Sequence, residues 1–382
     1  MLRWFQSVID PLITRYAHTL SLKRFPYVMP GDFPLSGGHC RRKVDIMVAS
    51  RAGTSMCWNE VRAVGELKCN AKASDLDLTV LQLANYVREI FGTQPGRRQV
   101  HAFTLCRANM RLWTFDRAGA VGSTIIDIHK QPAIFVAAML RFATMDAREV
   151  GFDPTIRWGT ENTDAIFDPT VHRKSLPGQG PFVRISCRRG GNATAEHKLL
   201  LYPRPLACRF AINTRGSICW KARWADSPDD EWSLIVKDQW RVSDREREGD
   251  FLRLLELPTP QPQTPGFTSP EPKAPEPTTQ EHQKSEPRLS KPLLPADGLP
   301  EYIWHGDTDS TDLLRDGLSF LAGVGSRYPP KFTKTSKRLA QESIPKLNRI
   351  HTRLVLSPVG QELLQSISYT QLLRAIHAAL RG

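Results

Sequence analysis

No stretch of this 382-residue sequence approaches the roughly 20 consecutive apolar residues that a helix needs to cross a bilayer. Residues 1–22 lack the continuous apolar core and the small-residue cleavage site of a secretory signal, and their pattern predicts an amphipathic helix instead. The seven cysteines are scattered, odd in number and without a CxxC pair, which argues against a zinc site or a disulfide framework. We therefore expect an intracellular protein, in the cytosol or the nucleus.

Acidic residues are too few to balance the basic ones. The chain has 39 Asp and Glu against 52 Lys and Arg, which gives a formal net charge of +13. Such a surplus favours anionic partners, here a nucleotide or a nucleic acid, and we expect no membrane partner. A basic surface that contacts only water is the alternative, because charge alone specifies no partner.

Large apolar residues are scarce in residues 257–300, where proline recurs instead. Proline cannot donate to a helix or a strand ladder, and little apolar surface is present to offset the entropy of ordering. We expect a disordered or partly polyproline insert, which serves either as a PxxP-type ligand for protein partners or as a plain linker. The insert divides the chain into four expected parts, residues 1–160, 180–256, 257–330 and 331–382.

The first part alternates between strand-like and helical patterns, which predicts an α/β domain. The expected strands are residues 44–49, 60–68, 99–106 and 110–116, and the expected helices are residues 78–92 and 131–145. The helix at 78–92 carries an apolar face made of Leu81, Leu83, Ala84, Val87 and Phe91.

The pattern changes to short strands separated by turns in residues 180–256, which indicates an antiparallel sheet followed by a helix. The expected strands are FVRISC, KLLLYP, LACRFAI, SICWKARW and WSLIVKD, and the expected helix is residues 245–257. After the insert, residues 349–357 form one more expected strand, and a hinge near Ser357–Gly360 leads into further helix. The whole chain is therefore predicted to be of the α+β class.

A lysine ends the apolar run Leu234–Val236, and its setting suggests phosphate binding. Antiparallel strands, a lysine strand, a helix with a glutamate and a further strand follow one another as in the N-lobe of a protein kinase. In that interpretation Gly216 and Ser217 form a turn that lets the backbone approach phosphate oxygens, and Lys237 pairs with the α- and β-phosphates. Glu248 would hold the lysine in place, with Glu246 as the alternative. A lysine that merely ends a strand is the structural alternative.

A second set of polar residues lies on the first expected strands. Asp45 lies on one strand, and Glu66 and Lys68 share one face of the next, because side chains alternate along a strand. Two carboxylates can bind a divalent metal, and a lysine beside them can orient water or stabilise a transition state. This D…ExK layout is that of the restriction-endonuclease-like fold. Gln82 and Tyr86, four apart on the next helix, resemble the QxxxY motif of its RecB-like branch. A scaffold with inactive polar residues is the alternative.

Several long stretches of the sequence, taken in the order in which they occur, resemble the fungal-type protein kinase family. They are VGELKCNAK, LQLANYVREIFGTQPGRRQVHAFTLC, RLWTFDRAG, IDIHK, GFDPTI, RGSICWKA, LIVKDQW, REREGDFL and NRIHTRLVLSPVGQELL. The resemblance implies an N-terminal region followed by a divergent kinase domain that uses ATP with magnesium. It also implies that Lys237 is the strand lysine and that Glu248 opens the helix carrying its partner. His351 lies in the NRIH stretch and is not the histidine of a catalytic loop.

The sequence departs from the family where phosphoryl transfer would need a loop aspartate and a metal-binding aspartate. No HxD followed by asparagine occupies a suitable position, and the sequence ends at Gly382 where the catalytic loop should approach. We therefore expect a truncated kinase relative with weak nucleotide binding and no transfer activity. Two alternatives are a metal-dependent nuclease acting through Asp45, Glu66 and Lys68, and a non-catalytic interaction protein.

Overall fold

The computed structural model describes residues 2–53, 55–75, 77–159, 164–172, 179–190, 193–227, 231–255, 300–315 and 348–359. The chain divides into two compact units, residues 1–247 with 303–359, and residues 248–302 with 360–382. Both sheets lie in the first unit, apart from the first two residues of strand β15. Helix α6 (Glu248–Leu255) belongs to the second unit.

The first sheet contains seven strands and is built mainly from antiparallel pairs. Its path is β1-β2-β3-β4-β5-β6, and β7 pairs with β5. The strands are β1 (Tyr27–Val28), β2 (Ile46–Ala49), β3 (Val61–Lys68), β4 (Gln99–Cys106), β5 (Asn109–Asp116), β6 (Gly119–Gly122) and β7 (Ile126–Asp127). Among the described strands of this sheet only β3 and β4 run parallel, and α3 (Asp77–Thr93) provides the crossover that a parallel pair requires.

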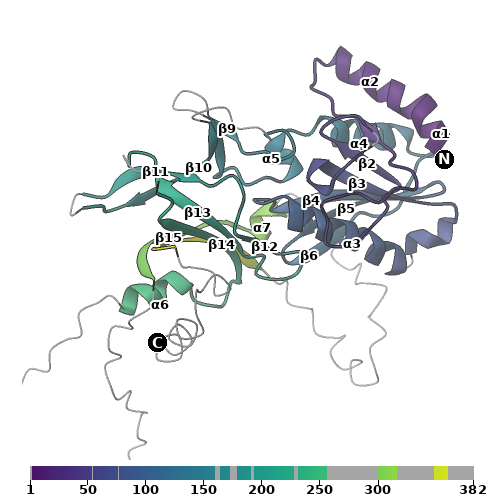
Figure 1. The fold of residues 1–382 in the computed structure, drawn as a ribbon. Coiled ribbons are helices and arrows are strands. Elements are labelled where there is room, and N and C mark those ends of the chain that lie inside the picture. The colour runs from purple at the N-terminus through teal and green to yellow at the C-terminus, as the bar shows by residue number, and fades with distance from the viewer. Residues whose placement is uncertain are drawn as a thin grey trace, which may run out of the picture. The chain divides into compact units, whose positions relative to one another are not determined.

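Helices cover both faces of this sheet (Figure 1). One core packs α2 (Asp10–Thr19) and α4 (Pro132–Thr144) against Ile46 and Val48 of β2. The other core packs α3 against Met47, the residue between them. Because neighbouring side chains on a strand point to opposite faces, the continuous apolar run of β2 serves both cores.

The amino-terminal segment forms the expected amphipathic helix. It runs through α1 (Leu2–Trp4), η1 (Phe5–Ile9) and α2, and the residues it buries are Phe5, Ile9, Ile13 and Ala17. Residues four apart share one face of a helix, so this spacing produces a single buried stripe. No helix among the described residues is long and apolar enough to span a bilayer.

The second sheet has nine strands, all joined by antiparallel pairs where the pairing is described. Its order is β15-β16-β14-β13-β11-β10-β8-β9, with β12 beside β13. The strands are β8 (Arg157–Gly159), β9 (Ala165–Ile166), β10 (Gly180–Cys187), β11 (Ala195–Leu201), β12 (Ala207–Cys208), β13 (Ile218–Trp224), β14 (Leu234–Val242), β15 (Glu301–Ser310) and β16 (Arg349–Ser357).

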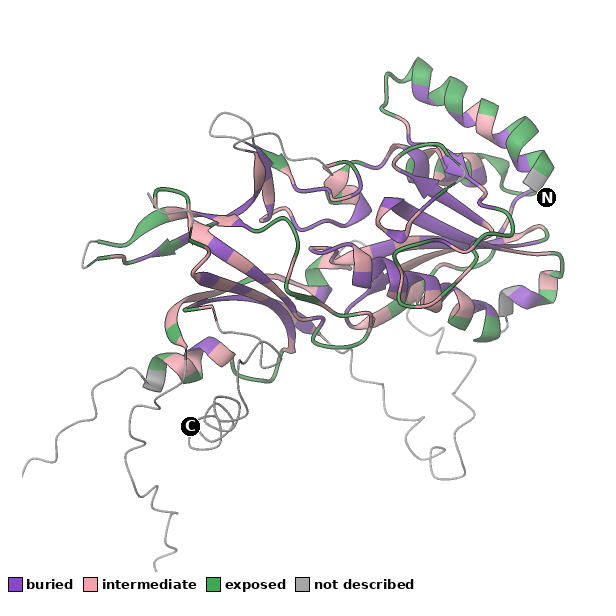
Figure 2. Cartoon of the chain, viewed as in Figure 1, coloured by how far each residue is buried: buried purple, intermediate pink, exposed green. Residues whose placement is uncertain are grey.

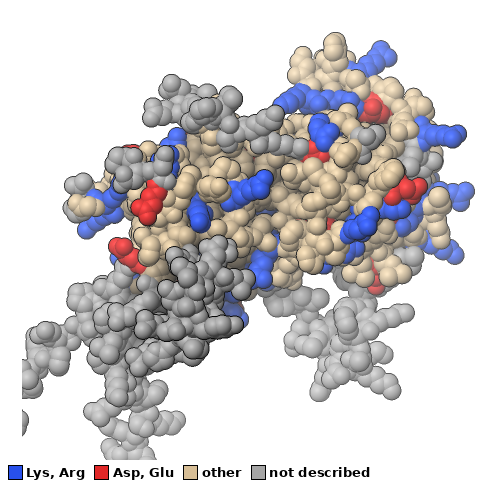
Figure 3. All heavy atoms as spheres, in the orientation of Figure 1, with Lys and Arg blue, Asp and Glu red and all other residues tan. Residues whose placement is uncertain are grey.

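One face of the second sheet carries its own apolar core (Figure 2). Trp220 on β13, Val236 on β14 and Val355 on β16 are fully buried and lie side by side in this core. Short helical segments complete the described fold: η2 (Trp58–Glu60), η3 (Ala71–Asp75), α5 (Ala147–Val150) and α7 (Thr311–Leu314). Basic side chains are spread over the surface drawn in Figure 3, with fewer acidic ones among them.

The mixed α+β class is confirmed, and most of the expected elements are present. On α3, Leu83, Val87 and Phe91 are buried as expected, but Leu81 is 58% exposed and does not belong to the apolar face. The strand expected at 206–212 is reduced to the two residues of β12, because Phe210 turns toward α3 and lies where a side chain on Gly92 would be.

The expectation of an insert and linker over residues 257–330 is wrong for residues 300–315. This stretch forms β15, which extends the sheet beside β16, and α7, whose N-cap Ser310 accepts a hydrogen bond from the Leu313 amide. The other parts of the expected insert, residues 257–299 and 316–330, lie outside the described residues. So does most of the segment after the hinge, residues 360–382.

Candidate functional site

Lys237 lies on β14, an interior strand of the second sheet, with Cys219 of β13 and Leu354 of β16 directly opposite. Its neighbours Val236 and Asp238 are buried on the other face, whereas Lys237 is half-buried. Strands paired on both sides hold the backbone of this lysine in place. Glu248 is the first residue of α6 and is half-buried, and the alternative Glu246 is exposed before the helix begins.

The expected turn at Gly216 is packed tightly against the first domain. Gly216 has a φ of +51°, and a β-carbon there would lie 2.7 Å from Nε of Arg117. The Gly216 amide donates to Oγ1 of Thr214 at 3.1 Å, and the Arg215 carbonyl accepts from the Trp240 amide at 2.6 Å. Glycine is therefore required here both by the backbone conformation and by the close approach of a buried guanidinium.

The polar residues expected on the first sheet come together in one hydrogen-bonded group. Lys68 Nζ forms an ion pair with Glu66 and donates to Oε1 of Gln82 at 3.0 Å. Nε2 of Gln82 in turn donates to the hydroxyl of Tyr86 at 2.8 Å. Asp45 lies beside them and accepts from the Leu67 amide at 2.9 Å. The ExK strand, the preceding acidic residue and the QxxxY helix thus meet at one place, on the face of the sheet that α3 covers.

Burial sets the electrostatics of this group. Glu66 is completely buried, and burial raises the pKa of its carboxyl, opposed by the hydrogen bond from Lys68 and assisted by the charge of Asp45. Burial also raises the pKa of Tyr86, with a smaller contribution from the charges of Glu66 and Asp45. The pKa of Lys68 is raised because contact with Glu66 and Asp45 outweighs its own burial. The group is a compact charged site in a largely apolar setting.

The donor set of this group fits a divalent cation. Oε2 of Glu66 is buried and accepts no hydrogen bond of ordinary geometry among the described residues, although the hydroxyl of Tyr86 interacts with the Glu66 carboxylate. A buried carboxylate oxygen with so weak a hydrogen-bond partner is costly, and a cation held with Asp45 would supply a stronger one. Lys68, which is one-third exposed, is the ion-pair partner of Glu66 at this site.

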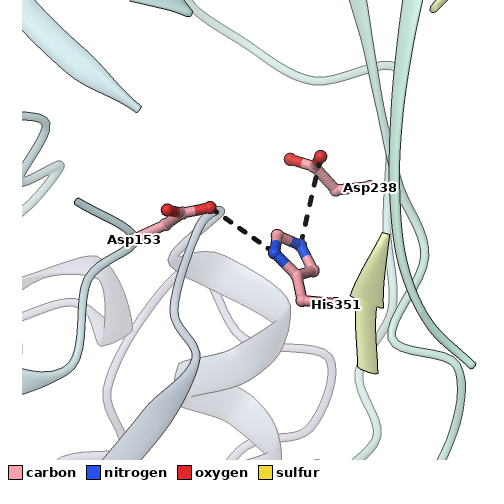
Figure 4. Close-up of side chains that lie close together, drawn as sticks. All are labelled: Asp153, Asp238 and His351. Carbon is pink, nitrogen blue, oxygen red and sulfur yellow. Dashed lines mark ion pairs between the residues drawn. The ribbon is translucent and has the colours of Figure 1, made fainter. Parts of the chain in front are cut away.

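A third group of charged residues was not identified from the sequence. Arg353 on β16 donates to both carboxylate oxygens of Asp238 on β14, at 2.7 and 3.1 Å, and to Asp153 after α5 at 3.2 Å. His351 lies between the same two aspartates, with Nδ1 3.7 Å from Asp153 and Nε2 4.0 Å from Asp238 (Figure 4). All four side chains are buried.

Two aspartates and a histidine at these distances have the composition of a metal site. However, Arg353 donates to both oxygens of Asp238 and to Asp153, so the carboxylate oxygens that a divalent cation would need already accept hydrogen bonds. Burial lowers the pKa of His351, although the charges of the two aspartates oppose this shift. The pKa of Asp153 is also lowered, because the charges of Arg353 and His351 outweigh the effect of burial. The cluster is therefore an ion-pair network that joins the segment after α5 to β14 and β16.

The sequence contained a signal for this network. Asp153, Asp238 and His351 with Arg353 lie in three of the stretches that carry the family resemblance, GFDPTI, LIVKDQW and NRIHTRL. Those stretches were separate motifs in the sequence, and the fold brings their charged residues into contact.

Comparison with known proteins gives one family. The model of the fungal protein kinase family matches residues 43–259, more than half of the chain. The matched range begins before β2 and ends after α6, so it contains Asp45, Glu66 and Lys68 as well as Lys237 and Glu248. No curated protein and no solved structure matched the chain.

Proposed function

Because the chain belongs to the fungal protein kinase family, we propose that it binds ATP with magnesium through the second sheet. The observation that supports this most is the position of Lys237 on an interior antiparallel strand, paired on both sides. A lysine on such a strand pairs with the α- and β-phosphates in protein kinases. Glu248 would hold this lysine in place, or Glu246 in its stead, and the turn at Gly216 and Ser217 would lie near the phosphates.

Binding without phosphoryl transfer is the activity we propose for these 382 residues. Transfer needs an aspartate that positions the attacking hydroxyl and a second aspartate that holds magnesium. The sequence has no HRD-type segment followed by asparagine and no DFG-type segment. The half-site formed by Lys237 and the turn would bind the phosphates and leave the chemical step to residues that this sequence does not contain.

Nucleotide titration of the full chain tests the proposal. Calorimetry with ATP and magnesium would compare the wild-type protein with Lys237→Ala, and Lys130→Ala would serve as the control because Lys130 is highly exposed on the first domain. A Glu248→Gln variant tests the positioning role, and it should weaken ATP binding less than the loss of Lys237 itself.

A second candidate function is supported by the group at Asp45, Glu66, Lys68 and Gln82. We propose that the first domain has the restriction-endonuclease-like fold and that this group hydrolyses phosphodiester bonds with a divalent cation. The metal would be held by the two carboxylates and would supply Lewis-acid activation of a water and of the phosphate. Lys68, which donates a hydrogen bond to Gln82, would stabilise negative charge on the phosphate.

Two variants distinguish the nuclease function from the nucleotide-binding function. Magnesium-dependent cleavage of single- and double-stranded DNA or RNA should be lost in Glu66→Gln, because the substitution removes a metal ligand, and retained in Lys237→Ala. Wild-type protein that cleaves none of these substrates would exclude the second function and leave the first untouched.

A further inference from the structure

A pocket of about 480 Å³ opens beside the turn at Gly216. Its lining includes Arg88 of α3, His39, and the segment before β13 that carries Arg209, Phe210 and Arg215. Small-molecule sites in proteins commonly have volumes of roughly 300–1,000 Å³. The pocket is therefore large enough for a ligand of several heavy atoms, and Lys237 is not among the residues that line it.

The charged side chains at this pocket are predominantly basic. Arg209 and Arg215 are exposed, and among the described residues neither forms an ion pair with a carboxylate. Arg88 pairs with Glu89, whose side chain is completely buried and is also 3.6 Å from the guanidinium of Arg42. One carboxylate is thus shared by two arginines, and the charge of the other two arginines is left for a ligand.

Two more guanidiniums lie buried behind the same segment. Arg117 donates to the Ala211 carbonyl at 2.5 Å and stacks on the ring of Phe91, and Arg349 donates to Oδ1 of Asn213 at 3.0 Å. Neither forms an ion pair with a carboxylate in the part of the chain that the structure describes. Burial lowers the pKa of Arg117 to about 10, which reflects the cost of burying this charge without a counter-ion. An anion in the pocket would reduce that cost.

Hydrogen bonds constrain the backbone of the turn that would contact the anion. These bonds are those of Gly216 and Arg215, and the turn places the side chains of Thr214 and Ser217 at the pocket as hydroxyl donors. The rings of Phe210 and His39 form one wall, with their centroids 5.6 Å apart. Hydrogen-bond donors that are ordered before binding lose less entropy when the ligand arrives.

We propose that this pocket binds a small phosphorylated anion through Arg209 and Arg215. Guanidinium groups match phosphate oxygens in geometry and in charge, and the hydroxyls of the turn supply further donors. This inference goes beyond the ATP site at Lys237, because the proposed anion site lies between the turn and α3 and does not include Lys237.

Calorimetric titration of the full chain with inorganic pyrophosphate tests this inference. Removing one charge-assisted contact should weaken binding by about tenfold, so both Arg209→Ala and Arg215→Ala should show that loss. Arg204→Ala is the matched control, because Arg204 is an exposed arginine of the same segment that does not line the pocket. This control should bind pyrophosphate with wild-type affinity.

Two results would overturn the inference: no pyrophosphate binding by the wild type, or a loss in Arg204→Ala equal to the losses in Arg209→Ala and Arg215→Ala. The test is independent of the proposed ATP site. If wild-type protein fails to bind ATP but binds pyrophosphate in a way that requires Arg215, the function proposed for Lys237 falls and the anion pocket stands.

Discussion

Arg353 on β16 donates two hydrogen bonds, of 2.7 and 3.1 Å, to the carboxylate of Asp238 on β14. Both side chains are almost completely buried. The same guanidinium reaches Asp153 in the segment after α5. Two buried carboxylates surround one guanidinium, which neutralises their charge. Arg353 therefore stabilises the fold of the first unit.

Replacing Arg353 by methionine should therefore destabilise the protein strongly. The variant leaves two buried carboxylates without their partner, and breaking such an arrangement costs about 3–5 kcal/mol. Urea unfolding at neutral pH measures the loss. Arg189→Met is the matched control, because Arg189 pairs with Asp226 at the surface, where an ion pair contributes less than about 1 kcal/mol. If the two variants lost equal amounts of unfolding free energy, the buried network would contribute no more to stability than a surface ion pair.

Stability should fall as the pH is lowered from about 6.5 toward 4. Burial lowers the pKa of His101 to about 4, whereas an unfolded histidine titrates near 6.5. Between these values the unfolded chain binds a proton that the folded chain does not, so acid favours unfolding. Unfolding free energies at pH 7 and pH 5 measure the effect. The difference should shrink in His101→Asn and persist in His18→Asn, where the histidine is exposed; identical pH dependence in both variants would refute this explanation.

Gly216→Ala should cost more stability than Gly190→Ala. Both glycines have positive φ, +51° and +61°, so alanine pays a backbone cost of about 1–2 kcal/mol at either position. At Gly216 the new β-carbon also meets Arg117 at 2.7 Å, whereas at Gly190 no atom of the described residues lies within 4 Å. Crowding in a packed site typically adds about 1–3 kcal/mol. Thermal unfolding of the two variants gives the comparison, and equal melting temperatures would mean that Arg117 moves aside freely.

The fold could be predicted where residue patterns were strong. Alternation and helical spacing located β3, β4, β5 and α3, and Asp45, Glu66, Lys68, Gln82 and Tyr86 could be placed together because they lie on consecutive elements. β15 could not, since its carboxyl half reads Gly-Asp-Thr-Asp-Ser, a polar stretch typical of a turn. Pairing with β16, about 45 residues later in the chain, makes it a strand.

The contacts of the buried ion-pair network could not be predicted, although its residues lie in stretches that carry the family resemblance. Arg353 is 115 residues from Asp238 and 200 residues from Asp153 in the sequence, so no local spacing relates them. A charged residue on a strand is also usually assigned to the solvent face, whereas these charges are buried against one another. Similarly, the close approach of Arg117 to Gly216 could not be predicted for a turn whose glycine was interpreted as making room for phosphate oxygens.

The affinity of the full chain for ATP with magnesium, measured for wild type and Lys237→Ala, tests the proposed function most directly. Loss of a charge-assisted contact to phosphate should weaken binding by about tenfold or more, while Lys130→Ala should bind as the wild type does. ATP binding that depends on Lys237 would support the second sheet as a nucleotide-binding lobe. Binding that is absent from the wild type, or unchanged in Lys237→Ala, would contradict it.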